Sequence, residues 1–141
     1  MEKEEKEFTQ EDQELLMNAS MLENQSRELE ANLEIIDREI VDLEKFLEGI
    51  NHLSKSKSNE ILASLGKGVY VKSSINESKL YVNVGQGIIV KKTPESTAKV
   101  IENQIQRLTE VRAQILQQLE IFTKNFSQVL KELEKLKHKT K

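Results

Sequence analysis

The feature that most constrains this chain is a seven-residue apolar repeat that occurs twice, on either side of a short segment punctuated by glycines. In the first stretch the repeated residues are Leu15, Leu22, Leu29, Ile36, Leu43 and Ile50. In the second they are Ile101, Leu108, Ile115, Phe122, Val129 and Leu136. A sustained repeat of this length predicts a helix that buries one narrow seam against a partner helix. Two such helices joined by a turn-forming segment predict an antiparallel coiled coil within one chain, with a small β head.

Helix-start signals precede both repeats. Thr9 with Asp12 has the pattern of a capping box, and Thr93-Pro94-Glu95 reads as an N-cap, a first-turn proline and a first-turn acid. We therefore expect helices over 8–54 and 94–138. The remaining seam positions are Ala19, Ser26, Leu33, Ile40 and Leu47, and Ala98, Ile105, Arg112, Leu119, Phe126 and Leu133. Ala19 and Ser26 bury little apolar surface, so the seam should be loosest towards the N-terminal end of the first helix.

Arg112 interrupts the apolar seam of the second helix. A charged residue at such a position could mark a functional pocket. The favoured interpretation is that Arg112 fixes the register of the two helices, with its guanidinium extending to an acid such as Asp37 or Glu39 on the facing helix.

The segment between the helices has β character. Apolar and polar residues alternate over much of 61–90, and glycines at 66, 68, 85 and 87 stand where tight turns are needed, because glycine tolerates positive φ. We predict two successive β-hairpins, near 61–75 and 79–92. The predicted fold class is α+β, mainly α: a long antiparallel two-helix coiled coil with two β-hairpins between the helices, forming one domain over 1–141. Four short strands leave open edges and an apolar face, so hairpins from several chains are expected to join.

Composition argues against several function classes. Aromatic residues make up 4% of the 141 residues and the formal net charge is −3, so neither base stacking nor a basic field favours nucleic acid. The chain has no Cys, which removes disulfides and Cys-ligated zinc. Its glycine turns lack P-loop spacing, and its two histidines, His52 and His138, are expected at opposite ends of the coiled coil. We therefore predict no enzymatic activity, no cofactor and no metal.

Targeting signals are also missing from the pattern. The charged start of the chain is unlike a secretory signal, and no apolar run approaches the roughly 18 residues of a membrane span. The absence of Cys fits a reducing compartment. A cytoplasmic protein without a membrane partner is predicted.

Several apolar residues near the N-terminus do not all fit the seam. These are Phe8, Leu16, Met17 and Met21, of which Leu16 and Met17 occupy positions that a two-stranded coiled coil exposes. Methionine is unbranched and polarisable, so it can repack against many different partners. A flexible apolar surface at the open end is one interpretation; ordinary fraying, with methionine as a gap filler, is the other.

The region from Leu65 to Leu108 resembles the α-type subunit of prefoldin, above all in the glycine-turn hairpin sequences at 65–71 and 82–90. Two hairpins rather than one point to the α class. The resemblance implies an ATP-independent chaperone subunit, a holdase. In that family two α-type and four β-type subunits join through their hairpins, grip unfolded polypeptides with the tips of their coiled coils, and pass these clients to a group II chaperonin.

The resemblance also implies roles for particular residues. The assembly residues would be Val69, Val71, Leu80, Val82, Ile88 and Val90. The client-binding residues at the tip would be Phe8, Leu16, Met17, Met21, Val129, Leu133 and Leu136. The alternative hypothesis is a structural coiled-coil adaptor that binds folded partner proteins, which predicts stoichiometric binding to one native protein and indifference to unfolded chains.

Overall fold

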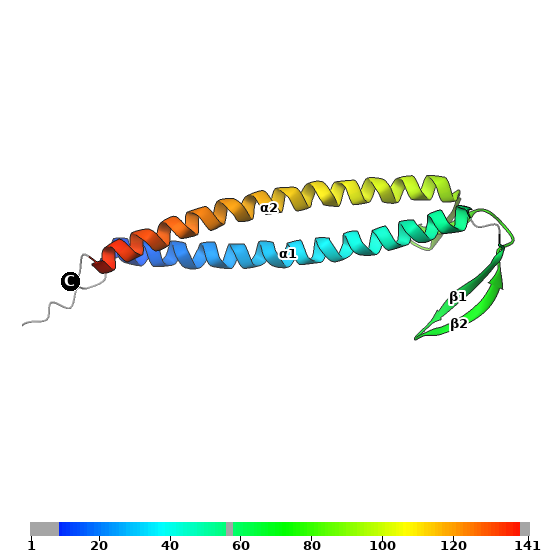
Figure 1. Ribbon diagram of the computed structural model, residues 1–141, viewed down its shortest axis with the longest axis horizontal. Helices are drawn as coiled ribbons and strands as arrows, with labels where there is room; N and C mark the ends of the chain where they lie inside the picture. The colour runs from blue at the N-terminus through cyan, green and yellow to red at the C-terminus, as the bar shows by residue number, and fades with distance from the viewer. Residues whose placement is uncertain (1–8, 56–57, 139–141) are drawn as a thin grey trace, which may run out of the picture. The chain divides into compact units, whose positions relative to one another are not determined.

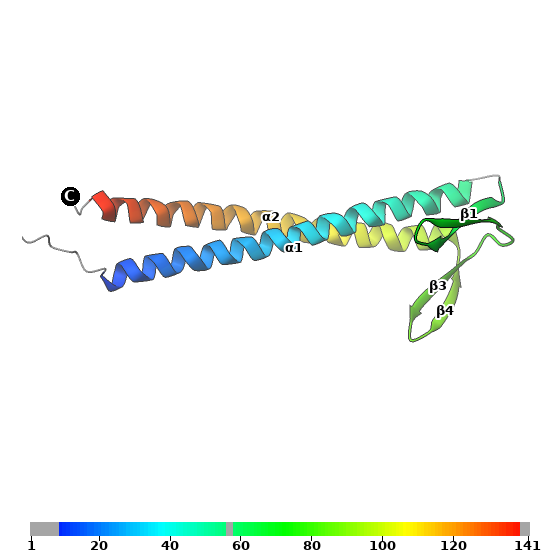
Figure 2. The ribbon, with the colours of Figure 1, turned by 90° about the horizontal axis from the view of Figure 1, so that it is seen from below.

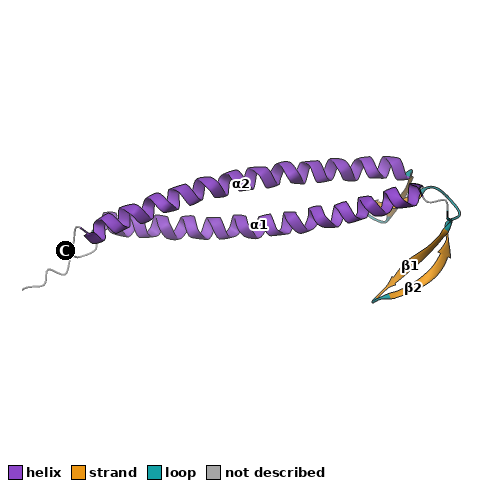
Figure 3. Cartoon of the chain, in the orientation of Figure 1, coloured by secondary structure: helices purple, strands orange, loops and turns teal. Residues whose placement is uncertain are grey.

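The computed structural model describes residues 9–55 and 58–138, which form two helices and four strands. In chain order these are α1 (Gln10–Lys55), β1 (Glu60–Gly66), β2 (Val69–Ser74), β3 (Leu80–Gly85), β4 (Ile88–Lys92) and α2 (Pro94–His138) (Figure 3). The predicted fold class, two long helices with two hairpins between them, is confirmed. Residue 8, where the first helix was expected to begin, lies outside the described residues.

The chain divides into two compact units. The first contains the described residues up to Arg38 and from Thr109 onwards, and the second is Glu39–Leu108. In the first unit, the N-terminal part of α1 runs antiparallel to the C-terminal part of α2 (Figure 1, blue and red). The second unit holds the other part of each helix together with both hairpins; Figure 2 labels β1 of the first hairpin and β3 and β4 of the second.

Both helices begin with the predicted caps. The Thr9 backbone N–H donates to Asp12 Oδ2 at 3.2 Å, and the Asp12 backbone N–H donates to Thr9 Oγ1 at 3.3 Å, which is a reciprocal capping box. At the start of α2 the Ser96 backbone N–H donates to Thr93 Oγ1 at 3.1 Å. These bonds satisfy backbone donors that have no partner within the helix.

The seam follows the heptads. Each heptad position named above is buried or half-buried, whereas most other helix positions are exposed. In the first unit, Arg112 Nε donates to Asp37 Oδ1 at 2.6 Å, so the arginine within the seam does bond an acid of the facing helix. This contact confirms Asp37, rather than Glu39, as its partner.

The tightest packing of the second unit lies where the helices meet the hairpins. Ile50, Ala98 and Ile101 are at most 8% exposed, and they form one apolar cluster. Partly buried residues packed against this cluster are Leu43, Leu47, Leu80 and Ile105. Leu80 begins β3, so the second hairpin is anchored to the coiled coil by its own first residue.

The two hairpins repeat one local design. β1 pairs with β2, and β3 with β4, each as a separate antiparallel two-stranded sheet. The turn residues Lys67 and Gly68 have φ of 52° and 80°, and Gln86 and Gly87 have 52° and 75°, as a two-residue primed turn requires. A register shift precedes each turn, between Ser64 and Gly66 and between Asn83 and Gly85. Each shift is bridged by a side chain that accepts the glycine N–H: Ser64 Oγ at 3.2 Å and Asn83 Oδ1 at 2.9 Å.

Candidate assembly and client-binding surfaces

The first hairpin collects its predicted assembly residues on one face. Val71 is the cross-strand partner of Ala63, and Val69 lies two residues away on the same strand, so both side chains leave the same side of the sheet. Ile61, paired with Ser73, belongs to this face as well. Val69 and Val71 are exposed. The chain itself therefore leaves this apolar face largely uncovered.

The second hairpin does the same with its four predicted residues. Val82 is paired with Val90, and Leu80 and Ile88 follow the same alternation on their strands. Ile88 and Val90 are exposed, Val82 is half-buried, and Leu80 reaches the core cluster of the second unit. Leu80 thus has a role within the chain that the sequence pattern did not separate from assembly.

The opposite faces of the hairpins are apolar too, and the predicted assembly residues include none of their side chains. Leu62 and Tyr70 lie on this side of the first hairpin, and Tyr81 and Ile89 on this side of the second; all four are exposed. The Tyr81 hydroxyl donates to Glu77 Oε2 at 2.9 Å. Lys91 Nζ lies 3.8 Å from the same oxygen and 5.4 Å from the Tyr81 ring centroid. These contacts give the second hairpin a polar patch beside Ile89.

The predicted client-binding residues on α1 are accessible. Leu16, Met17 and Met21 are 45%, 65% and 55% exposed. The predicted exposure of Leu16 and Met17 is confirmed. Phe8, the fourth member of the predicted set, lies outside the described residues.

The predicted client-binding residues on α2 lie differently. Val129, Leu133 and Leu136 are half-buried seam residues that close the coiled coil of the first unit. The exposed apolar residue in this part of α2 is Leu130, at 43%, which the sequence analysis passed over. The heptad pattern could have identified Leu130, because it directly follows the seam residue Val129 and so lies beside the seam.

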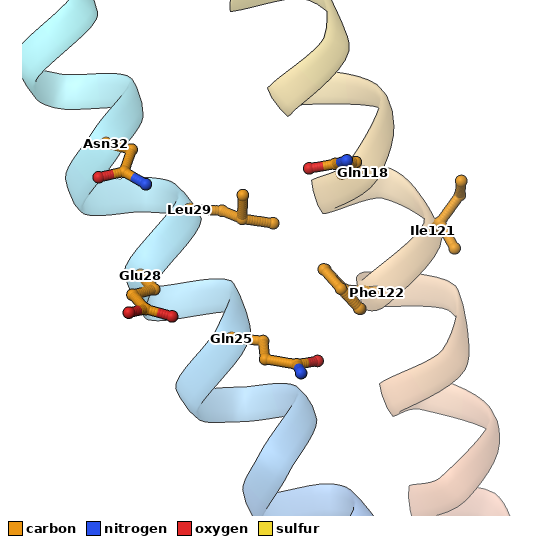
Figure 4. A pocket seen from close by; sticks show the side chains of 7 residues that line it. All are labelled: Gln25, Glu28, Leu29, Asn32, Gln118, Ile121 and Phe122. Atoms are coloured by element: carbon orange, nitrogen blue, oxygen red, sulfur yellow. The ribbon is translucent and has the colours of Figure 1, made fainter.

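A hollow of about 280 Å³ opens between the helices of the first unit. Figure 4 shows Leu29 and Phe122 pointing towards each other from α1 and α2, with Gln25 and Gln118 beside them. The full lining is Gln25, Glu28, Leu29, Asn32, Gln118, Ile121 and Phe122. The heptad pattern counts Leu29 and Phe122 as a filled apolar layer, so the sequence analysis did not foresee this space.

Other kinds of site find no support in the part of the chain that the structure describes. No three His, Cys, Asp or Glu side chains come together there as a metal site would require. Neither long helix, over its described residues, carries an apolar stretch that could cross a bilayer. The surfaces described above can therefore bind a partner mainly through apolar contacts, with neutral amides and a few charged side chains beside them.

The comparisons with known proteins agree on one family. The prefoldin subunit family model matches residues 22–139. Prefoldin subunit alpha 2 of Thermococcus kodakarensis is 34% identical over 83 residues, a match that spans 58% of this chain and 58% of the relative. Prefoldin subunit alpha of Methanococcus vannielii is 28% identical over 120 residues, 84% of this chain and 81% of the relative.

A solved structure shares the fold. The filamentous PFD of Methanocaldococcus jannaschii, determined by cryo-electron microscopy, superposes with a TM-score of 0.69 at 22% identity, covering 82% of this chain and 98% of the other. The predicted resemblance to the α-type subunit is confirmed by the named relatives. Because the family model covers most of its length, the chain belongs to the prefoldin subunit family, which is a family of chaperones and not of enzymes.

Proposed function

We propose that this chain is the α-type subunit of an ATP-independent holdase. Its open end, which carries Leu16, Met17 and Met21, binds unfolded polypeptides, and its hairpins join β-type subunits in a hexamer of two α-type and four β-type chains. The complex acts in the cytoplasm and passes its clients to a group II chaperonin. The observation that carries the proposal is the exposure of these three apolar side chains on α1.

The coiled coil does not need these three side chains for its own packing. Its seam is closed by residues such as Leu15, Leu22 and Val129, so Leu16, Met17 and Met21 add little to the stability of the folded chain. Full burial of such a side chain contributes about 1.5–3 kcal/mol, and about half of that is available here because the three side chains are already partly covered. Loss of translational freedom and ordering of the client offset part of this gain, so one subunit binds weakly and reversibly. Several subunits in one complex raise the overall affinity through effective concentration.

The hairpins support the assembly half of the proposal. Val69, Val71, Ile88 and Val90 are exposed on one face of their sheets, and every strand of a two-stranded sheet is an edge strand. Such sheets are only marginally stable in water. Joining hairpins of other subunits would cover the apolar faces and pair the open edges at the same time.

A denatured client tests the client-binding half. The complex with a β-type partner, without nucleotide, should suppress aggregation of the client as measured by light scattering. Serine at Leu16, Met17 and Met21 together should weaken this effect measurably, although the β-type chains keep their own tips. The control places serine at Ile35, Val100 and Leu116, which are also exposed apolar residues on the two helices. Equal activity of the two triple variants would contradict the proposed site.

The chaperonin step and the adaptor alternative need separate measurements. Addition of a group II chaperonin should transfer a fluorescent client from the complex, which gel filtration detects as a change in the size of the client-bearing species. An adaptor would instead bind one folded protein at fixed stoichiometry and would leave aggregation of denatured clients unchanged. That pair of results would replace the holdase proposal.

A further inference from the structure

The hollow between Leu29 and Phe122 is large enough for one apolar side chain. Ligand pockets for cofactors and drug-sized molecules begin at about 300 Å³, and a dry cavity of about 150 Å³ is known to accept benzene. At about 280 Å³ the hollow is large enough for a leucine or phenylalanine side chain but too small for most cofactors. Its floor is apolar, because Leu29 and Phe122 face each other across it (Figure 4).

The rim of the hollow suits a main chain. Gln25, Asn32 and Gln118 line it, and each of their side-chain amides both donates and accepts hydrogen bonds. An extended polypeptide offers unpaired N–H and C=O groups along its whole length, whatever its sequence. Neutral amides around an apolar floor therefore match an extended segment that inserts one apolar side chain.

The charge of the rim refines this match. Glu28 lines the hollow, and among the ion pairs of the described residues none includes it. In contrast, Glu23 and Glu34 are each paired with an arginine four residues further along α1, at 2.6 and 2.7 Å. An exposed carboxylate at the rim favours a segment with a basic residue next to its apolar one.

The hollow is also continuous with the proposed client surface. Met17, Met21, Gln25, Glu28 and Asn32 are spaced by four, four, three and four residues, so they line one face of α1. Met17 and Met21 are exposed at one end of this stripe, and the hollow opens beside its other end. A segment held by the methionines can therefore follow the stripe into the hollow without crossing the helix.

We infer that the hollow is a second holding point for a non-native polypeptide, which receives one apolar side chain of a segment already bound at Met17 and Met21. This inference rests on the proposed client binding. From Met17 to Leu29 is 29 − 17 = 12 residues, or about 18 Å along the helix. An extended chain covers that distance in about five residues. The preferred segment thus carries two large apolar residues about five positions apart, with a Lys or Arg beside the inner one.

Labelled peptides test the inference on the full-length chain. One peptide carries two leucines five positions apart, with a lysine beside the second, in a Ser/Gly background; the other is identical except that serine replaces the second leucine. Fluorescence anisotropy should show the two-leucine peptide binding about ten-fold more tightly, as burial of a second leucine predicts. Ile121→Glu, at the rim, should reduce this ratio to near one, since the new carboxylate acts on the lysine of both peptides alike.

Ile35→Glu is the matched control. Ile35 and Ile121 occupy equivalent heptad positions outside the seam, are 63% and 56% exposed, and only Ile121 lines the hollow. Ile35→Glu should keep the ten-fold ratio, and circular dichroism should show equal helix content in both variants. An unchanged ratio in Ile121→Glu overturns the inference. So does self-association of the wild-type chain that Ile121→Glu abolishes, because a second copy would then occupy the hollow.

Failure of the proposed function gives a different pattern. If serine at Met17 and Met21 weakens both peptides while Ile121→Glu changes neither, client binding stands and the hollow has no part in it. If serine at Met17 and Met21 has no effect on either peptide, the proposed client surface itself is wrong, and the inference is lost with it.

Discussion

Val82→Asp tests the shared β face most directly. Val82 is half-buried, pairs with Val90, and lies on the face that carries all the predicted assembly residues of the second hairpin. If that face is covered by other subunits, the substitution removes about 1–2 kcal/mol of apolar burial. It also places a carboxylate without a partner in the interface, which costs about 3–5 kcal/mol. Lys92 is diagonal to position 82 on the same face, and an ion pair with it would offset about 1 kcal/mol.

The net cost is then about 4 kcal/mol for each interface that contains the residue. At 1.4 kcal/mol per factor of ten, the association constant should fall about a thousand-fold. Native mass spectrometry of the chain mixed with a β-type subunit at micromolar concentration should show dissociated subunits for Val82→Asp and the assembled complex for the wild type.

Asn83→Asp is the matched control for this experiment. It adds the same charge one residue away, on the opposite face of the sheet, and an aspartate can still accept the hydrogen bond that Asn83 Oδ1 takes from the Gly85 N–H. The complex should persist in this variant. An intact complex with Val82→Asp, or equal dissociation by the two variants, would refute assembly through the Val82 face.

Three further predictions concern stability, each measured by urea or thermal unfolding followed by circular dichroism. Arg112→Leu should raise the free energy of unfolding by about 1 kcal/mol. The side chains of the Arg112–Asp37 pair are 42% and 46% exposed, so the ion pair contributes under about 1 kcal/mol, whereas burial of a leucine in the seam contributes more. A lower stability of the variant would show that the ion pair contributes more than the leucine. Thr93→Ala should lower the free energy of unfolding by about 1 kcal/mol through loss of the α2 cap, whereas Thr93→Ser should lower it little. Equal stabilities of the two variants would show that the cap does not stabilise the fold. Gly87→Ala should destabilise by about 1 kcal/mol, since its φ is +75° and no atom obstructs a Cβ, so only backbone strain acts. Gly49→Ala, equally unobstructed but helical, should stabilise by a similar amount, and the same sign for both glycines would contradict the strain argument.

Local signals in the sequence predicted much of the fold. The heptads identified the seam residues because a two-stranded coil buries the same two positions of every seven. Thr9 and Thr93 were recognisable as caps because their bonds reach only three residues along the chain. Both hairpins could be located from their glycine turns, because a tight turn also depends only on residues that are adjacent in the sequence. Arg112 and Asp37 are 75 positions apart; the heptad pattern predicted Asp37 or Glu39 as the partner of Arg112, and only the structure distinguishes the two.

The parts that were missed depend on volumes and on pairing. Phe122 and Leu29 fit the heptads, yet whether their layer is filled depends on the distance between the helices, which a repeat does not encode. The register shifts at Ser64 and Asn83 arise from pairing between strands, so alternation along one strand could not reveal them. In contrast, the apolar character of both hairpin faces could have been read from the runs Val69-Tyr70-Val71 and Ile88-Ile89-Val90, because successive side chains of a strand point to opposite faces.

The two hairpins of this chain share one local design, so both are suited to the same proposed role in assembly. Lys67-Gly68 and Gln86-Gly87 adopt the same turn, and a side chain bridges the register shift before each of them in the same way. If assembly proceeds through the hairpins as proposed, a chain with two such hairpins can join two neighbours at once, whereas a chain with one hairpin can join only one.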